Sequence, residues 1–233
     1  MIARSHCSKS RNVLTTCREA SMFKKISTFV LFLLLAVASI EGASAQNASI
    51  IPNLGISKDM RSVTSNRWNM GFNLGLNAFW PVSGVISLGG RAAYHHWGAD
   101  ADGWAADYAK NFGTGYSYTV QSSSGSQSVI ELIPSLKIAT SSGDSPTTLD
   151  VQFGVGMFLV SVSDVKIGGS FRTGFSSGTA DVTFASESLT GFGFQAGLPL
   201  TIARRFQILP LYSLYWAGGD AYHHITFNAG IVL

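Results

Sequence analysis

The chain has 233 residues, of which 12% are charged, and 16 Lys and Arg against 13 Asp and Glu give it a formal net charge of +3. Both cysteines and six of the basic residues fall within residues 1–45, so residues 46–233 hold ten basic residues, eleven acidic residues and no cysteine. This distribution excludes a disulfide scaffold, a cysteine zinc site, a nucleophilic cysteine and a strongly basic nucleic-acid binder from residues 46–233.

Residues 22–45 have the pattern of a secretory signal peptide. Two lysines are followed by the apolar run 29–38 (FVLFLLLAVA) and by the small-residue cleavage site Ala43-Ser44-Ala45. A membrane-anchoring helix, the alternative, needs about 20 apolar residues to cross the hydrocarbon core, about twice the length of this run. We therefore predict that residues 1–45, an N-terminal extension plus signal peptide, are removed on export, and that residues 46–233 form one domain.

Residues 46–233 alternate apolar residues with small or polar ones, the pattern of strands whose two faces differ. In residues 68–80, for example, Phe72 and Leu74 share one face and Asn73 lies on the other. The pattern predicts eight strands, at residues 49–57, 68–80, 84–97, 129–138, 148–159, 190–200, 205–216 and 222–233. In the first of them Pro52 lacks an N–H, so it must lie at a gap in the ladder or at a bulge.

The connections between these segments alternate between short and long. Residues 81–83, 139–147 and 201–204 are short connections, whereas residues 98–127 and 161–189 are long and polar. The connection 217–221 is an exception, because it is short where the alternation demands a long one. The alternation indicates an antiparallel meander with a plain end, which carries the short turns, and a decorated end, which carries the long loops. We predict an all-β, antiparallel up-and-down barrel of eight strands with both termini on the same side.

Two kinds of barrel fit this pattern: a soluble barrel with an apolar ligand cavity, and a transmembrane barrel whose apolar face meets lipid. The polar face consists mostly of Gly, Asn, Ser and Gln, which suit a narrow lumen better than a water-facing surface. The sequence therefore favours the transmembrane barrel. Aromatic residues near strand ends are interpreted as rings at the two membrane interfaces; they are Trp68, Trp80, Trp97, Tyr215, Trp216 and Tyr222.

The signal peptide and the eight alternating segments resemble the small eight-stranded outer-membrane β-barrel proteins of Gram-negative bacteria, a porin-like family. Residues 225–233 (ITFNAGIVL) are similar to the C-terminal assembly signal of that family, although Leu233 stands where the family usually has an aromatic residue. The resemblance implies a place in the cell outer membrane, contact with outer-membrane lipid, and recognition of the last strand by the barrel assembly machinery. It implies no cofactor.

Four charged residues fall on the lumen face: Arg91, Glu131, Lys137 and Asp150. The interior of an eight-stranded barrel is just wide enough for side chains to fill it, and buried charges must be paired. We therefore predict an internal ion-pair network rather than a binding or conducting site. A hairpin placed symmetrically about Gly143-Asp144 sets Lys137 opposite Asp150.

The four histidines of residues 46–233 form two adjacent pairs, His95-His96 and His223-His224, both at the predicted decorated end. Imidazole and nearby carboxylate groups are the chemistry of a divalent metal site. Adjacent strand residues point to opposite faces, however, so each pair offers only one inward ligand. We expect solvated histidines at the barrel rim and no metal site.

His224-Ile225-Thr226 places a histidine and a hydroxyl on one face of the last strand. This spacing faintly resembles the histidine–serine pair of the lipid A deacylase family of small barrels, which uses serine where this chain has Thr226. No carboxylate could be placed beside this histidine, so no catalytic residue is predicted.

The sequence thus favours an integral outer-membrane barrel with a structural or surface-interaction role, a lumen filled by side chains, no enzymatic activity and no nucleic-acid partner. An extracellular ligand would bind at the loops 98–127 and 161–189. A narrow porin or transport channel is the first alternative, and a lipid-modifying outer-membrane enzyme is the second.

Overall fold

A computed structural model describes residues 48–60, 67–110, 117–140, 145–172 and 176–233. The predicted signal peptide and N-terminal extension lie outside these residues. Residues 47–233 form one compact unit. Among the described residues, no helix is long and apolar enough to cross a bilayer.

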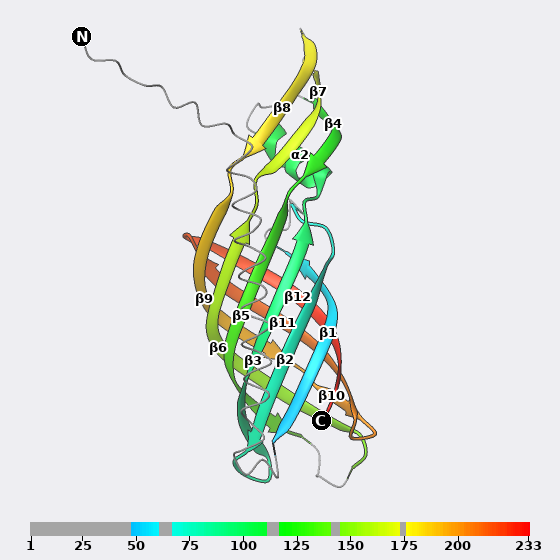
Figure 1. Ribbon diagram of the computed structural model, residues 1–233, viewed down its shortest axis with the longest axis vertical. Helices are drawn as coiled ribbons and strands as arrows, with labels where there is room; N and C mark the ends of the chain where they lie inside the picture. Colours follow the sequence, from blue (N-terminus) through cyan, green and yellow to red (C-terminus); the bar gives the residue numbers. More distant parts are fainter. Residues whose placement is uncertain (1–47, 61–66, 111–116, 141–144, 173–175) are drawn as a thin grey trace, which may run out of the picture. The chain divides into compact units, whose positions relative to one another are not determined.

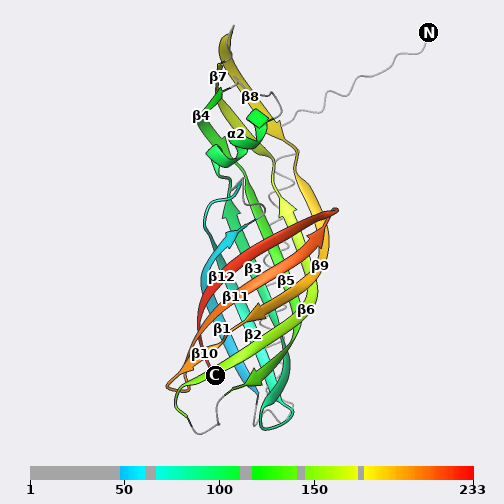
Figure 2. The same cartoon turned by 180° about the vertical axis from the view of Figure 1, so that it is seen from behind.

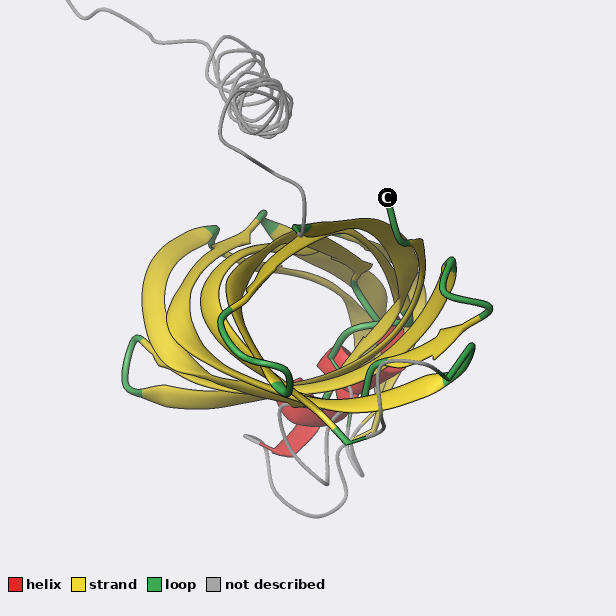
Figure 3. Ribbon diagram, turned by 90° about the horizontal axis from the view of Figure 1, so that it is seen from below, coloured by secondary structure: helices red, strands yellow, loops and turns green. Residues whose placement is uncertain are grey.

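The main sheet closes on itself as an antiparallel barrel (Figures 1 and 3). Around the ring its order is β10-β11-β12-β1-β2-β3-β5-β6-β9, and additional pairings of β11 with β9 and of β10 with β6 complete the circle. The strands are β1 (Ser49–Asp59), β2 (Gly71–Pro81), β3 (Ile86–Gly98), β5 (Ser126–Ala139), β6 (Thr148–Val162), β9 (Glu187–Gly197), β10 (Leu200–Ile202), β11 (Phe206–Ala217) and β12 (Asp220–Ile231).

β9 and β10 occupy a single position in the ring, because both pair with β6 on one side and with β11 on the other. Only Leu198 and Pro199 separate them. The barrel therefore has eight strands, which confirms the predicted fold class.

Pro52, which was expected at a gap in the ladder or at a bulge, lies in the first strand, β1. Pro52 lies opposite Leu76 of β2, but the ladder between β1 and β12 begins only at the next residue, Asn53. Pro52 therefore stands at the end of one of its two ladders, where a missing N–H is tolerated. At this same end the backbone N–H of Leu233 donates to the carbonyl of Ile50 at 2.9 Å, so the first and last strands meet there (Figure 2).

The two long connections are not loops over most of their length, which corrects the prediction. They hold α2 (Ala101–Lys110), β4 (Ser117–Ser124), β7 (Val165–Arg172) and β8 (Ser177–Phe184). β4, β7 and β8 form a separate three-stranded antiparallel sheet at the decorated end (Figure 1). β4 leads into β5, β7 follows β6 and β8 leads into β9, so three neighbouring barrel strands continue in sequence into this sheet. We call it, together with α2, the extension.

The junction between β4 and β5 needs a glycine. Gly125 has φ +132°, a conformation that residues with a Cβ rarely adopt, and an added Cβ would lie 2.8 Å from a side-chain carbon of Val165. α2 is capped at its start by Asp100, whose Oδ1 accepts a hydrogen bond from the backbone N–H of Gly103 at 3.0 Å. α2 thus begins at Ala101, with only two residues between it and the end of β3 at Gly98.

The barrel is polar inside and apolar outside, because the alternation of each strand is kept around the whole ring. Buried positions include Asn53, Asn77, Gln152, Gln195, Ser213, Thr226 and Asn228. Exposed positions include Leu54, Phe72, Leu74, Leu88, Phe153, Val155, Phe194, Ile208 and Phe227. A protein in water normally shows the opposite arrangement.

A second buried cluster is hydrophobic and lies where the barrel meets the extension. Trp104 of α2 packs edge-on against Trp68 with ring centroids 5.5 Å apart, and its ring lies 4.6 Å from that of Phe184 of β8. The cluster also contains Trp97, Phe158, Val165, Ile167, Tyr215 and Tyr222. This aromatic cap joins the decorated end of the lumen to the extension.

Candidate functional site in the barrel lumen

Glu131 is the centre of the polar lumen. Its side chain has 0% exposed surface, because the alternation of β5 directs it inward. Oε2 accepts hydrogen bonds from Arg91 Nε at 3.2 Å and from Gln195 Nε2 at 3.1 Å. Oε1 faces His224 Nε2 at 2.7 Å and His95 Nε2 at 3.3 Å. Each carboxylate oxygen therefore has its own set of partners.

Arg91, on β3, extends the network to the next two strands of the ring, β2 and β1, whereas His224 meets Glu131 from β12 on the opposite wall. Arg91 Nη1 donates to Asn53 Oδ1 at 3.1 Å and to Asn77 Oδ1 at 3.3 Å. Ser213 Oγ completes the set with a hydrogen bond of 3.4 Å to Glu131 Oε1. Seven of the eight barrel strands contribute a side chain to this network, and we call it the lumen network.

The two inward histidines are not solvated rim residues, which corrects the prediction. His95 and His224 have side chains 0% and 1% exposed, and their rings lie 4.9 Å apart across the lumen. Their sequence neighbours face the other side of the wall: His96 Nδ1 lies 3.0 Å from Ser128 Oγ, and His223 Nδ1 lies 2.5 Å from the Tyr212 hydroxyl. The alternation was predicted correctly, but the depth of the inward residues was not.

Lys137 and Asp150 form a separate pair near the plain end. Their charged atoms are 3.9 Å apart. The predicted register was wrong by two residues, because Lys137 lies opposite Gln152, and Asp150 opposite Ala139. A shift of two keeps both side chains on the lumen face, so they still meet diagonally. They line a pocket of about 240 Å³ together with Thr201, Gln207 and other residues of that end.

The interpretation of the six strand-end aromatic residues as interface rings is wrong for four of them. Trp68, Trp97, Tyr215 and Tyr222 are buried in the aromatic cap, where lipid cannot reach them. Tyr215 stacks on Phe158 with ring centroids 4.3 Å apart and on Tyr222 at 5.0 Å. Only Trp80 and Trp216, 44% and 51% exposed, lie on the outer face.

The histidine–threonine spacing of the last strand also faces inward. Thr226 is buried, and its hydroxyl accepts a hydrogen bond from Asn228 Nδ2 at 3.3 Å. Glu131 supplies the carboxylate beside His224 that the sequence could not place. The barrel wall separates both residues from the apolar outer face, so a lipid lying against that face does not reach them.

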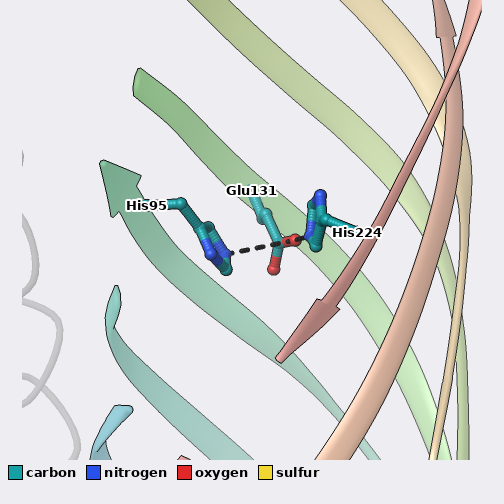
Figure 4. Close-up of side chains that lie close together, drawn as sticks. All are labelled: His95, Glu131 and His224. Carbon is teal, nitrogen blue, oxygen red and sulfur yellow. Dashed lines mark hydrogen bonds and ion pairs between the residues drawn. The ribbon is translucent and has the colours of Figure 1, made fainter. Parts of the chain in front are cut away.

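Sequence reasoning missed the convergence of His95, Glu131 and His224, whose nearest ligand atoms all lie within 4.8 Å of one another (Figure 4). They come from β3, β5 and β12. Each was predicted to face the lumen, but whether they share one level depends on the stagger of the strands, which no local pattern encodes.

Comparison with known proteins found solved structures only: no family model matches the chain, and no curated protein does. The attachment invasion locus protein Ail of Yersinia pestis is 14% identical, with 80% of this chain and 97% of that chain covered and a TM-score of 0.44. Neisserial surface protein A is 10% identical (79% and 96% covered, TM-score 0.41). The N-terminal β-barrel domain of Pseudomonas aeruginosa OprF is 11% identical (80% and 98% covered, TM-score 0.36). These neighbours are small eight-stranded outer-membrane β-barrels, and the closed barrel described above is established by the chain's own strand register.

Proposed function

We propose that this protein is an integral barrel of a Gram-negative outer membrane with a structural or surface-interaction role and no enzymatic activity. The observation that carries the proposal is the polarity of the two faces, which is the reverse of that in a water-soluble protein: hydrogen-bonded charges lie inside and large apolar side chains lie outside. Folded proteins in water rarely expose a contiguous apolar patch beyond a few hundred Å². A belt of Leu, Phe, Val and Ile around all eight strands is instead suited to the hydrocarbon of a bilayer, so outer-membrane lipid is the proposed partner of this face.

The lumen favours a closed barrel over the alternative of a porin. The lumen network spans the interior from Glu131 on β5 to His224 on β12, the opposite strand of the ring, and the aromatic cap covers it toward the extension. Side chains thus occupy the cross-section through which a solute would have to pass. The pocket near Lys137 and Asp150 is a recess at one mouth, on the plain-end side of this network.

The extension is the part proposed to meet other molecules. It lies at the end opposite the two chain ends of the barrel, and it presents two outer sheet edges, of β4 and β8. An extracellular ligand would bind here, on residues 98–127 and 161–189. The last strand, β12, is the proposed contact with the barrel assembly machinery, since its outward residues Phe227 and Ile231 are exposed and its inward Thr226 and Asn228 are polar.

Four measurements test the proposal. A closed transmembrane barrel should fractionate with outer membranes and migrate differently on gels before and after boiling. Purified protein in planar bilayers should show no steady single-channel openings. Protease added to intact cells should cut within the extension and leave β1 and β12 whole. Recovery of the folded protein in the soluble periplasm would contradict membrane insertion, and regular openings would favour the channel.

A further inference from the structure

We propose that His95, Glu131 and His224 bind one divalent transition-metal ion of the Zn²⁺ class inside the lumen. The three residues lie inside the barrel, so the proposed site does not depend on whether lipid or water surrounds the outer face. Two imidazoles and one carboxylate are a donor set that Zn²⁺ accepts, with its remaining position open to a solvent molecule.

The geometry brings the three donors to one point. His95 Nε2 and His224 Nε2 approach the same oxygen of Glu131, Oε1, at 3.3 and 2.7 Å. Figure 4 shows the two rings on opposite sides of the carboxylate, each with its edge toward it. The ligand atoms all lie within 4.8 Å of one another, so an ion placed among them needs only small side-chain rotations to reach bonding distance.

Hydrogen bonds hold the carboxylate as the outer partners of metal ligands usually do. Oε2 of Glu131 is occupied by Arg91 and Gln195, at 3.2 and 3.1 Å, which leaves Oε1 turned toward the histidines. The ring of His95 is stacked on Trp97 at 5.4 Å with only 7° between the planes. Both histidines stand on barrel strands rather than on loops, which favours a fixed geometry.

A second observation points independently to a ligand. His95 Nε2 makes no hydrogen bond with any described residue, although the side chain is buried and Glu131 Oε1 lies 3.3 Å away. Buried polar atoms are nearly always partnered, and an unpartnered one costs about 1–3 kcal/mol. A metal ion bonded to the two Nε2 atoms would take the place of the hydrogen bond that His95 Nε2 does not make.

Charge at the site also allows a cation. Glu131 balances Arg91, and the register of β1 against β12 places Asp59, another buried carboxylate, directly opposite His224. Gln127 Nε2 donates to Asp59 at 3.3 Å and so fixes it on the lumen side. Two buried carboxylates, Glu131 and Asp59, therefore lie close enough to stabilise the positive charge of a divalent ion.

The test uses full-length folded protein without a histidine tag, freed of metal with a chelator and titrated with Zn²⁺ by calorimetry. We expect one ion per barrel, and Co²⁺ in its place should give the absorption bands of a low-coordinate nitrogen and oxygen site. The variant His95→Gln/His224→Gln should lose more than the roughly 10- to 100-fold in affinity that removal of an outer partner costs. The matched control is His96→Gln/His223→Gln, which changes the same residue type one position away, on the other face of the wall.

Three results would overturn the proposal: no Zn²⁺ bound by the folded wild type, equal loss of affinity in the control variant, or unchanged affinity in the lumen variant. Gel migration before and after boiling reports whether each variant folds. If the lumen variant does not fold, X-ray absorption of the Zn²⁺-loaded wild type identifies the atoms bound to the ion and so tests the proposed ligands. Imidazole nitrogens at about 2.0–2.1 Å support the site, and an all-oxygen shell contradicts it.

Discussion

Arg91 Nε lies 3.2 Å from Glu131 Oε2, and neither side chain has any exposed surface. Moving such a pair out of water is costly, and the cost is recovered only when the remaining donors and acceptors are also satisfied. Here Asn53, Asn77 and Gln195 supply further hydrogen bonds, whereas Arg91 Nη2 makes none with the described residues. The pair therefore takes the place that a hydrophobic core has in a soluble protein, and it joins strands that are distant in the sequence.

Breaking this pair should destabilise the barrel strongly. Arg91→Met leaves the Glu131 charge buried without its main partner, and we expect it to lower the free energy of unfolding by about 3–5 kcal/mol. Urea titration of the protein in lipid vesicles, followed by tryptophan fluorescence, measures this. The double variant Arg91→Met/Glu131→Met should recover part of the loss, since no lone charge remains.

Lys137→Met is the control for that experiment. Its partner Asp150 is 3.9 Å away, and both residues line the pocket at the plain end rather than the interior of the lumen network, so we expect a smaller loss than that of Arg91→Met. A loss as large as that of Arg91→Met would mean that the lumen network does not hold the barrel together.

A charged substitution on the outer face should lower the free energy of unfolding more strongly the deeper it lies in the bilayer. Leu74 lies in the middle of β2 and Leu149 at the start of β6, and both are exposed. In vesicles Leu74→Arg should cost about 2–4 kcal/mol and Leu149→Arg about 0–1 kcal/mol. The same titration measures both. In a barrel whose outer face met water, neither arginine would destabilise the fold, and that outcome would contradict membrane insertion.

The wall should not tolerate a methyl group at Gly193. A Cβ there would lie 2.2 Å from the carbonyl oxygen of Leu214 and 2.5 Å from Cβ of Tyr215. We expect Gly193→Ala to lower stability by about 1–3 kcal/mol through overpacking. Gly84→Ala is the control, because nothing lies within 4 Å of its added Cβ. Equal urea midpoints for the two variants would show that Gly193 does not lie this close to Leu214 and Tyr215 in the membrane.

The extension should loosen without the barrel when Trp104 is removed. Its ring contacts Trp68 and Phe184 and lies 4.8 Å from the Arg67 guanidinium. In Trp104→Ala we expect faster proteolysis within α2 and β4, while gel migration still reports a folded barrel. Cleavage rates followed by mass spectrometry test this against Asp102→Ala, an exposed position of the same helix. Unchanged rates would show that Trp104 does not anchor α2.

The strands and their inward faces were predictable because the alternation runs over ten or more residues in most of them. The errors have identifiable causes. Continuing the alternation through residues 69 and 70 predicts an outward Trp68, whereas β2 begins only at Gly71. Trp97 has the same parity as Arg91, which already indicated an inward position. Its parity, and not its place near a strand end, determines the face on which Trp97 lies, and the side chain is 0% exposed.

Other features could not be predicted locally. The strands of the extension are eight residues long and rich in Gly, Ser and Thr, so their alternation is weak. β7 and β8 form a local hairpin, but β4 pairs with β7 across a large sequence distance. The convergence of His95, Glu131 and His224 depends on how eight strands are staggered around the barrel. That stagger is a property of the closed sheet rather than of any one segment.

The most direct test of the central claim, that the apolar face meets lipid and the polar face is a closed lumen, is fluorescence quenching by brominated lipids. Of two variants that each keep a single tryptophan, one should retain Trp216, 51% exposed on the outer face, and the other Trp97, 0% exposed inside. We predict that lipids brominated on their acyl chains strongly quench Trp216 and leave Trp97 nearly unchanged. Quenching of both to the same degree, or of Trp97 alone, would contradict the account.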